Sequence, residues 1–252
     1  MRVLAVIQAR MSSSRLPGKV LMPLAGRPVL QFLLERLARS VSVTRVVVAT
    51  SIDRSDDAIV EFCARRGVPC RRGPLDNVAR RFRDALAAES CDALVRVNAD
   101  SPLLDPRLID QGVGHFCAGD YDLVTNTWPR SYPPGQSVEV LAPEAFCRAY
   151  DLMTEAADFE HVTRVYYRRA DDFRIHNFSR RPPCTDAHLA VDTAEDFERI
   201  ERIVARMTRP QAEYSLDGIL RLHAEVGGLG AARGVDSARA WGSRMNGEEV
   251  CA

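Results

Sequence analysis

Short apolar runs alternate along the first half of the chain with segments whose apolar residues recur at helical spacing. Runs rich in Val, Ile and Leu are typical of strands buried on both faces of a sheet. The expected strands are 3–7, 45–50, 68–71 and 93–97, and the expected helices between them are 28–37, 55–66 and 76–89. Because single helices separate the strands, we expect right-handed crossovers and a mainly parallel sheet.

The pattern becomes less regular after about residue 120. The segment 128–135 is rich in proline and other turn-forming residues, so it cannot form a central strand. Later strands are expected at 123–125, 138–141, 173–178 and 189–191, and later helices at 143–153, 158–170, 194–207 and 215–225. We therefore expect one α/β domain over 1–225 with an inserted subregion at about 121–180, followed by a mobile tail at 226–252.

Composition indicates a globular protein with a sizeable core, since 46% of the 252 residues are hydrophobic and 27% are charged. Lys plus Arg and Asp plus Glu number 34 each, so no global field attracts nucleic acid or an anionic membrane. The chain lacks both the apolar core of a signal peptide and a membrane-spanning stretch of roughly 20 residues. We expect a cytoplasmic protein in which any recognition of anions is local.

Cysteine and histidine usage gives no sign of a metal or disulfide framework. The seven cysteines are irregularly spaced and form no Cys-x-x-Cys pair, which is typical of reduced core residues. The five histidines form no His-x-x-x-His pair. We therefore expect no tightly bound transition metal.

A loop rich in cations and hydroxyl groups follows the first expected strand. It contains Arg10, Arg15 and Lys19, three consecutive serines and a glycine, and it contains no acid. The carboxyl ends of strands are where open α/β sheets bind ligands, and this set of groups suits a polyphosphate. The alternative is an ordinary solvated loop, but three cations without an acid in a neutral chain favour binding.

Two acidic residues, Asp100 and Asp192, complete a candidate phosphate site. Asp100 follows the strand expected at 93–97, and Asp192 follows an apolar run and precedes a helix. Together they could hold Mg²⁺ against a polyphosphate, although alone Asp192 could be a helix cap and Asp100 a turn residue. The chain has neither a P-loop nor a Gly-x-Gly-x-x-Gly segment, which disfavours a P-loop enzyme or an NAD dehydrogenase.

The segment 5–19 resembles the N-terminal signature of the cytidylyltransferases that make CMP-activated acidic sugars. This family includes 3-deoxy-manno-octulosonate and acylneuraminate cytidylyltransferases, and the resemblance is strongest to the branch of spore-coat polysaccharide biosynthesis. Weaker matches follow in the family's order at 72–78, 98–106, 138–140, 160–163 and 191–196. The resemblance covers about residues 2–205.

The resemblance implies a Rossmann-like nucleotide-diphospho-sugar transferase fold, a homodimer, and Mg²⁺-dependent transfer of CMP from CTP with release of pyrophosphate. Arg10, Arg15 and Lys19 would hold the triphosphate, and Asp100 and Asp192 would bind Mg²⁺. Arg15, Lys19 and Asp100 are the implied catalytic residues. Further nucleotide-binding residues implied by position are Ala9, Ser14, Thr50, Arg72, Gly73 and Asn98.

The implied acceptor is a small, anionic sugar or sugar-like molecule. The residues expected on its side of the site are Arg130, Tyr132, Gln136, Glu139, His161 and Arg164. His161 fits a structural role on a helix equally well. Two positions depart from the family pattern: Ala99 replaces a glycine, and Gln136-Ser137 replaces Leu-Asp. The missing acid indicates a different acceptor.

Three functions remain open from the sequence. The first is a Mg²⁺-dependent cytidylyltransferase. The second is a glycosyltransferase that uses a nucleotide sugar, which normally requires an Asp-x-Asp motif where this chain has Asn98-Ala99-Asp100. The third is a nucleotide-binding protein without turnover, which the presence of both Asp100 and Asp192 disfavours.

Overall fold

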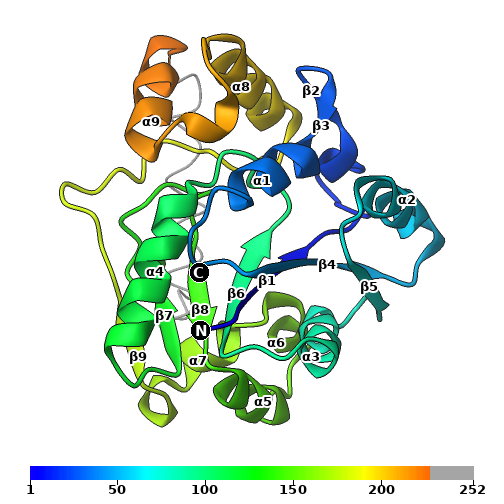
Figure 1. The fold of residues 1–252 in the computed structure, drawn as a ribbon, viewed down its shortest axis with the longest axis vertical. Helices are drawn as coiled ribbons and strands as arrows, with labels where there is room; N and C mark the ends of the chain where they lie inside the picture. The colour runs from blue at the N-terminus through cyan, green and yellow to red at the C-terminus, as the bar shows by residue number, and fades with distance from the viewer. Residues whose placement is uncertain (228–252) are drawn as a thin grey trace, which may run out of the picture.

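A seven-stranded sheet with the order β5-β4-β1-β6-β8-β7-β9 forms the centre of the computed structural model, which describes residues 1–227 (Figure 1). The strands are β1 Val3–Gln8, β4 Arg45–Ser51, β5 Cys70–Gly73, β6 Ala93–Asn98, β7 Leu123–Thr125, β8 Glu139–Leu141 and β9 Ile175–Asn177. Only β8 runs antiparallel to its neighbours in this sheet, and the other pairs are parallel. The expected mixed, mainly parallel sheet is confirmed.

Nine helices of the described part flank this sheet. They are α1 Val29–Leu37, α2 Asp57–Arg66, α3 Val78–Ala88, α4 Pro106–Ala118, α5 Pro143–Asp151, α6 Ala156–His161, α7 Arg164–Arg168, α8 Ala194–Ala205 and α9 Leu216–Glu225. A small hairpin, β2 Pro23–Leu24 and β3 Arg27–Pro28, precedes α1. None of the described helices is long and apolar enough to cross a membrane.

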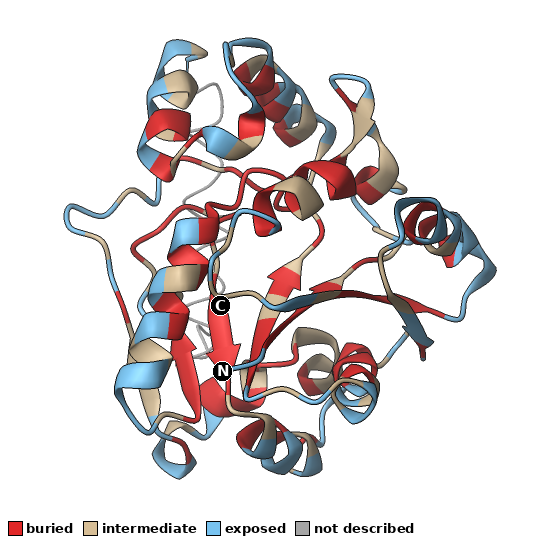
Figure 2. Cartoon of the chain, viewed as in Figure 1, coloured by how far each residue is buried: buried red, intermediate tan, exposed pale blue. Residues whose placement is uncertain are grey.

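Strand β1 is buried on both faces, which explains its uninterrupted apolar run. Val3, Ala5 and Ile7 belong to the core shared with α1, α2, α4, α8 and α9. Leu4 and Val6 face the second core, which contains residues of α3, α5 and α7. Figure 1 shows α3, α5 and α6 on one side of the sheet and α1, α8 and α9 on the other. The helices expose only their outer surfaces (Figure 2).

The sequence patterns missed helix α4. Asp105 caps its start by accepting a hydrogen bond from the Arg107 N–H at 3.1 Å, and Pro106 occupies its first turn. Gly112 weakens the helical pattern, since glycine is a poor helix former. It lies where a Cβ atom would come within 3.0 Å of Val138, so close packing on the sheet accounts for it.

Two other expectations were wrong. The helix expected over 158–170 is divided into α6 and α7 by Val162, whose φ of 46° interrupts the helical backbone. The segment 189–191 pairs with loops instead of a strand: the Leu189 N–H donates to Pro134 O and the Val191 N–H to Asp100 O, both at 2.8 Å. The second bond ties the segment before Asp192 to the segment that carries Asp100.

The expected inserted subregion extends the same sheet through β7, β8 and β9, because β8 pairs directly with β6. Helices α5, α6 and α7 also fall within it. Residues 228–252, nearly all of the expected tail, lie outside the described residues.

Candidate active site

A cavity of about 440 Å³ lies at the carboxyl ends of β1 and β6. Its charged lining comprises six cations, Arg10, Arg15, Lys19, Arg81, Arg96 and Arg130, and four acids, Asp100, Asp192, Glu139 and Glu160. Positive charge therefore exceeds negative charge here, in a chain whose net charge is zero. The cavity is suited to an anionic ligand.

The loop after β1 is folded so that Lys19 points into this cavity. Asp56 holds the loop by accepting a hydrogen bond from the Met11 N–H at 2.7 Å. Gly18 closes it with an N–H bond to Met11 O at 2.8 Å and a φ of +74°, a conformation that favours glycine. Lys19 follows at once in a short 3₁₀ helix, and its side chain is only 10% exposed.

The Lys19 ammonium lies between two carboxylates that come from distant parts of the chain. Its Nζ is 2.7 Å from Asp100 Oδ2 and 2.9 Å from Asp192 Oδ1. Burial by itself would lower the pKa of Lys19, but the two carboxylates outweigh burial and raise this pKa above its ordinary value. Arg15 adds a 2.9 Å ion pair to Asp192 from a side chain that is 62% exposed.

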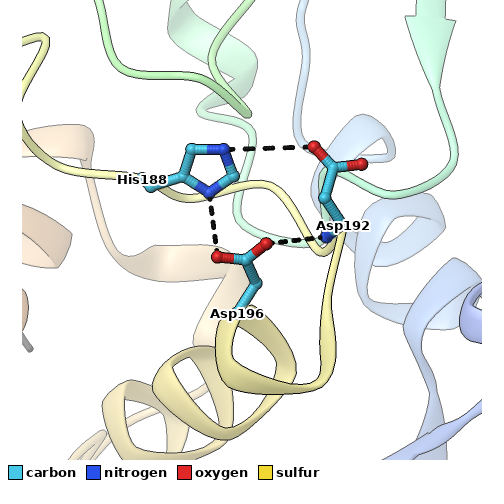
Figure 3. Close-up of side chains that lie close together, drawn as sticks. All are labelled: His188, Asp192 and Asp196. Carbon is cyan, nitrogen blue, oxygen red and sulfur yellow. Dashed lines mark hydrogen bonds and ion pairs between the residues drawn. The ribbon is translucent and has the colours of Figure 1, made fainter. Parts of the chain in front are cut away.

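Asp192 is positioned by His188 and Asp196, as Figure 3 shows. Asp196 Oδ2 accepts hydrogen bonds from the N–H groups of Asp192 and Thr193 at 3.1 and 3.0 Å. Its other oxygen is 2.8 Å from Arg199 and 3.2 Å from His188 Nδ1. Burial would raise the pKa of Asp196, but His188 and Arg199 lower it well below the ordinary range. The three side chains of Figure 3 are close enough to share a cation, yet Asp196 is already fully engaged, so we assign it to positioning Asp192.

The cavity lining also contains a buried ion pair. Arg96 Nη1 is 2.5 Å from Glu139 Oε2, and the Tyr167 hydroxyl donates to Glu139 Oε1 at 2.6 Å. Burial would raise the pKa of Glu139, but Arg96 and Tyr167 lower it below its ordinary value. Half-buried Arg130 donates two hydrogen bonds to the neutral Ser137 hydroxyl, both at 3.1 Å. Burial lowers the pKa of Arg130.

The family model described as cytidylyltransferase matches residues 4–225. The chain belongs to the cytidylyltransferase family. It is therefore a nucleotidyltransferase, which favours the first of the three functions left open by the sequence. Membership also agrees with the expected nucleotide-diphospho-sugar transferase fold, since solved structures of cytidylyltransferases share this architecture.

The relatives include proteins of the expected branches. The chain is 32% identical to the spore coat polysaccharide biosynthesis protein SpsF of Bacillus subtilis over 224 residues, which cover 84% of this chain and 91% of that protein. It is 28% identical over 216 residues to the 8-amino-3,8-dideoxy-manno-octulosonate cytidylyltransferase of Shewanella piezotolerans, with 81% and 86% coverage. A solved cytidylyltransferase structure from Leptospira borgpetersenii aligns with a TM-score of 0.82, 25% identity and complete coverage of both chains.

The cavity of this cytidylyltransferase brings together most of the residues predicted from its sequence. Its lining includes Ala9, Arg10, Ser14, Arg15, Lys19, Asn98, Asp100, Asp192, Arg130, Glu139 and His161. Arg10 forms a two-point contact with Glu160, with Nη2 to Oε1 at 2.7 Å and Nη1 to Oε2 at 3.3 Å. The structure thus places one predicted triphosphate ligand in an ion pair that the sequence did not indicate.

Three residues predicted to bind the nucleotide do not line the cavity. Thr50 is fully buried, and its hydroxyl has no hydrogen-bond partner among the described residues. Arg72 donates to the carbonyl groups of Ser51 and Asp53 at 2.8 and 2.9 Å, which fastens the turn after β4. Gly73 lies at the end of β5. Their predicted contacts with the nucleotide remain predictions.

Three residues predicted for the acceptor side are also absent from the lining. Tyr132 is buried edge-on against Phe178. Gln136 is fully buried and bonds to the backbone of Leu103 and Asp105 at 2.8 and 2.9 Å. Arg164 pairs with Asp158 and Glu155 at 2.6 and 2.8 Å, which stabilises the α6–α7 junction. These contacts give all three residues structural roles in the described chain.

Sequence reasoning missed several residues of the lining. Among them are Arg81, Arg96, Glu160 and Ser137. Glu160 stood in a segment that matches the family and Ser137 at a position that departs from it, whereas Arg81 lies inside a helix and Arg96 inside a strand. A cation on the otherwise apolar strand β6 was a signal that could have been used for Arg96.

Proposed function

We propose that this cytidylyltransferase transfers CMP from CTP to a small anionic sugar or sugar-like acceptor. The bond between the α-phosphorus and the oxygen that bridges to the β-phosphorus breaks, a new bond joins the α-phosphorus to the acceptor oxygen, and pyrophosphate leaves. The observation that carries this proposal is the convergence of Asp100, Asp192 and Lys19 beside the cationic loop. The loop cations, together with a metal ion held by the two carboxylates, would neutralise a triphosphate during in-line transfer.

Mg²⁺ is part of the proposal, and the residues present suit it. Asp100 Oδ2 and Asp192 Oδ1 converge on one point, since both are within 2.9 Å of Lys19 Nζ. Carboxylate oxygens are the protein ligands that Mg²⁺ prefers, usually one or two together with substrate phosphates. We propose that these two aspartates hold the ion, which would offset charge on the phosphates.

The cationic loop supplies the remaining contacts to the triphosphate in this proposal. Lys19 and Arg15 already lie beside the carboxylates, so small movements of these side chains would bring them to phosphate oxygens. Arg10 would have to share its guanidinium between Glu160 and the nucleotide, or release Glu160. Each group acts by binding and by orienting the α-phosphorus for attack.

In this proposal the acceptor binds beside Arg96 and Arg130, which both line the cavity. Glu139 neutralises Arg96 through the 2.5 Å contact, whereas among the described residues Arg130 donates only to the uncharged Ser137 hydroxyl. A half-buried guanidinium without a hydrogen-bonded acid is suited to the carboxylate or phosphate of an acceptor. His161 also lines this cavity.

Pyrophosphate release tests the proposal. Purified protein is incubated with CTP, Mg²⁺ and either 3-deoxy-manno-octulosonate or its 8-amino-3,8-dideoxy analogue, the sugar acids named for two groups of relatives. We expect acceptor-dependent pyrophosphate release together with a CMP-sugar product identified by mass spectrometry. Pyrophosphate release from none of a panel of sugar acids and sugar phosphates, despite tight CTP binding, would contradict an anionic acceptor. Failure to bind CTP would contradict the donor.

A further inference from the structure

One cation of the cavity has no hydrogen-bond partner in the part of the chain that the structure describes. Arg81 is 2% exposed, and its Nε and Nη1 atoms have no hydrogen-bond acceptor among the described residues. It nevertheless lines the cavity. A buried donor without an acceptor destabilises a folded protein, and a buried charge does so more strongly. A side chain retained in this state is suited to a ligand that supplies the acceptors.

The two acids whose charges act on Arg81, Asp56 and Glu160, are committed to other groups. Asp56 accepts hydrogen bonds from the N–H groups of Met11 and Ser51 and from the Ser51 hydroxyl. Glu160 is held in the two-point contact with Arg10. Both acids attract Arg81 at a distance, but burial and the Arg10 charge outweigh them and lower the pKa of Arg81.

Arg81 lies on the β5 side of the cavity, away from the two aspartates proposed as metal ligands, although the charge of Arg10 reaches it. Its side chain leaves α3 beside the end of β5, where its Cγ would lie 2.8 Å from a Cβ atom added to Gly73. Asp100 follows β6, and the sheet order β5-β4-β1-β6 puts three strand spacings of about 4.8 Å between the two strands. In a nucleotide whose phosphates lie at Asp100, the part that extends furthest from them is the base.

Apolar surface accompanies Arg81 at this end of the cavity. Val78 precedes it by one helical turn, on the same face of α3, and also lines the cavity. Ala9, which follows β1 two strands away from β5, is another buried apolar residue of the lining, between Arg81 and the aspartates in the order of the sheet. This combination suits a flat ring, which can pack on the small apolar side chains and accept hydrogen bonds from the guanidinium.

We propose that Arg81 reads the pyrimidine base and selects cytosine over uracil, an inference that rests on the proposed use of CTP. A guanidinium offers donors only, in a fixed fork. Cytosine presents two adjacent acceptors, O2 and N3, which match this fork. Uracil carries a hydrogen on N3, so it leaves one donor of Arg81 opposed by another donor. A bidentate contact between arginine and a base discriminates against the wrong base by about 5- to 150-fold.

Nucleotide binding to the Arg81→Gln variant tests this inference. Calorimetry measures the affinities for CTP and UTP, each with Mg²⁺. The glutamine amide offers one donor and one acceptor, which match O2 and N3–H of uracil. We expect the wild-type preference for CTP to fall by at least tenfold. Arg80→Gln is the matched control, because Arg80 precedes Arg81 on α3, is 52% exposed and pairs with Asp84. It should leave the preference unchanged.

Two further measurements separate base recognition from other roles. Inorganic tripolyphosphate with Mg²⁺ should bind equally well to wild type and Arg81→Gln, and a parallel loss would make Arg81 a phosphate ligand and overturn the inference. The melting temperature of Arg81→Gln should be equal to or higher than that of wild type, since a desolvated charge is removed. A lower melting temperature with an unchanged CTP-to-UTP ratio would assign Arg81 a structural role. A wild type that binds neither nucleotide would instead contradict the proposed function.

Discussion

Replacing Lys19 by methionine should let a divalent ion bind tightly in the absence of nucleotide. The Lys19 ammonium lies 2.7 and 2.9 Å from the two carboxylates proposed as metal ligands, and its side chain is 10% exposed. An ion that approaches Asp100 and Asp192 must therefore displace this ammonium or share the oxygens with it. Methionine retains an unbranched side chain but removes the charge.

The two contacts set the size of the effect. A hydrogen bond to a charged group contributes about 1.5–3 kcal/mol, and each 1.4 kcal/mol corresponds to a tenfold change in affinity. In Lys19→Met the ion no longer has to break one such bond, so its affinity should increase by about 10- to 100-fold. Arg15→Met is the graded comparison, because the Arg15 side chain is 62% exposed and forms an ion pair with Asp192. An exposed pair contributes at most about 1 kcal/mol, so this variant should gain no more than about fivefold.

Titration of nucleotide-free protein with Mn²⁺, followed by electron paramagnetic resonance, measures these affinities directly. The double variant Lys19→Met/Asp192→Asn should lose the gain, because one ligand is then missing. The same Lys19→Met variant should bind CTP more weakly than wild type, since a phosphate contact is lost. Equal Mn²⁺ affinities in wild type and Lys19→Met, or a larger gain in Arg15→Met, would refute the view that Lys19 occupies the ion site.

Three further predictions concern other parts of the site. Asp100→Asn should reduce the rate of pyrophosphate release at least about 100-fold. Asp92→Asn, at the opposite end of β6, is the control and should leave this rate unchanged. Equal rates in both variants would remove Asp100 from the mechanism. Arg96→Met should lower the free energy of unfolding by about 3–5 kcal/mol in urea denaturation, because Glu139 is then buried without its cation. The pKa of Glu139 is lowered in the folded protein, so ionised Glu139 contributes to the free energy of unfolding above its unfolded pKa of about 4.5, and this contribution is lost as the pH falls. Below that pH, the stability of wild type should therefore decline more steeply than that of Arg96→Met. Gly135→Ala should lower the melting temperature and raise the KM for CTP. Gly135 has a φ of +90°, and an added Cβ would lie 2.3–2.6 Å from the backbone of the segment before Asp192. A variant with wild-type stability would show that Gly135 is not in close contact with this segment.

The buried strands were predictable because each apolar run is a local signal. β1, β4 and β6 pack on both faces, so each contains a run of at least three apolar residues. Helix α4 was missed because glycine weakened its pattern, although Asp105 and Pro106 marked its start. The helix expected over 158–170 was divided at Val162, where a positive φ cannot be inferred from a β-branched residue.

The sequence by itself determined the alternation of strands and helices, the cationic loop and the two acids that follow apolar runs, because each of these is set by neighbouring residues. Only the tertiary structure decided that Lys19 bridges Asp100 and Asp192, which lie 81 and 173 positions further along the chain. It also decided that Arg81 is buried without a hydrogen-bond partner among residues 1–227, while Arg10 is paired with Glu160. The sequence gives the type and charge of each residue directly, but the partner of each charged side chain depends on which segments the sheet order brings together.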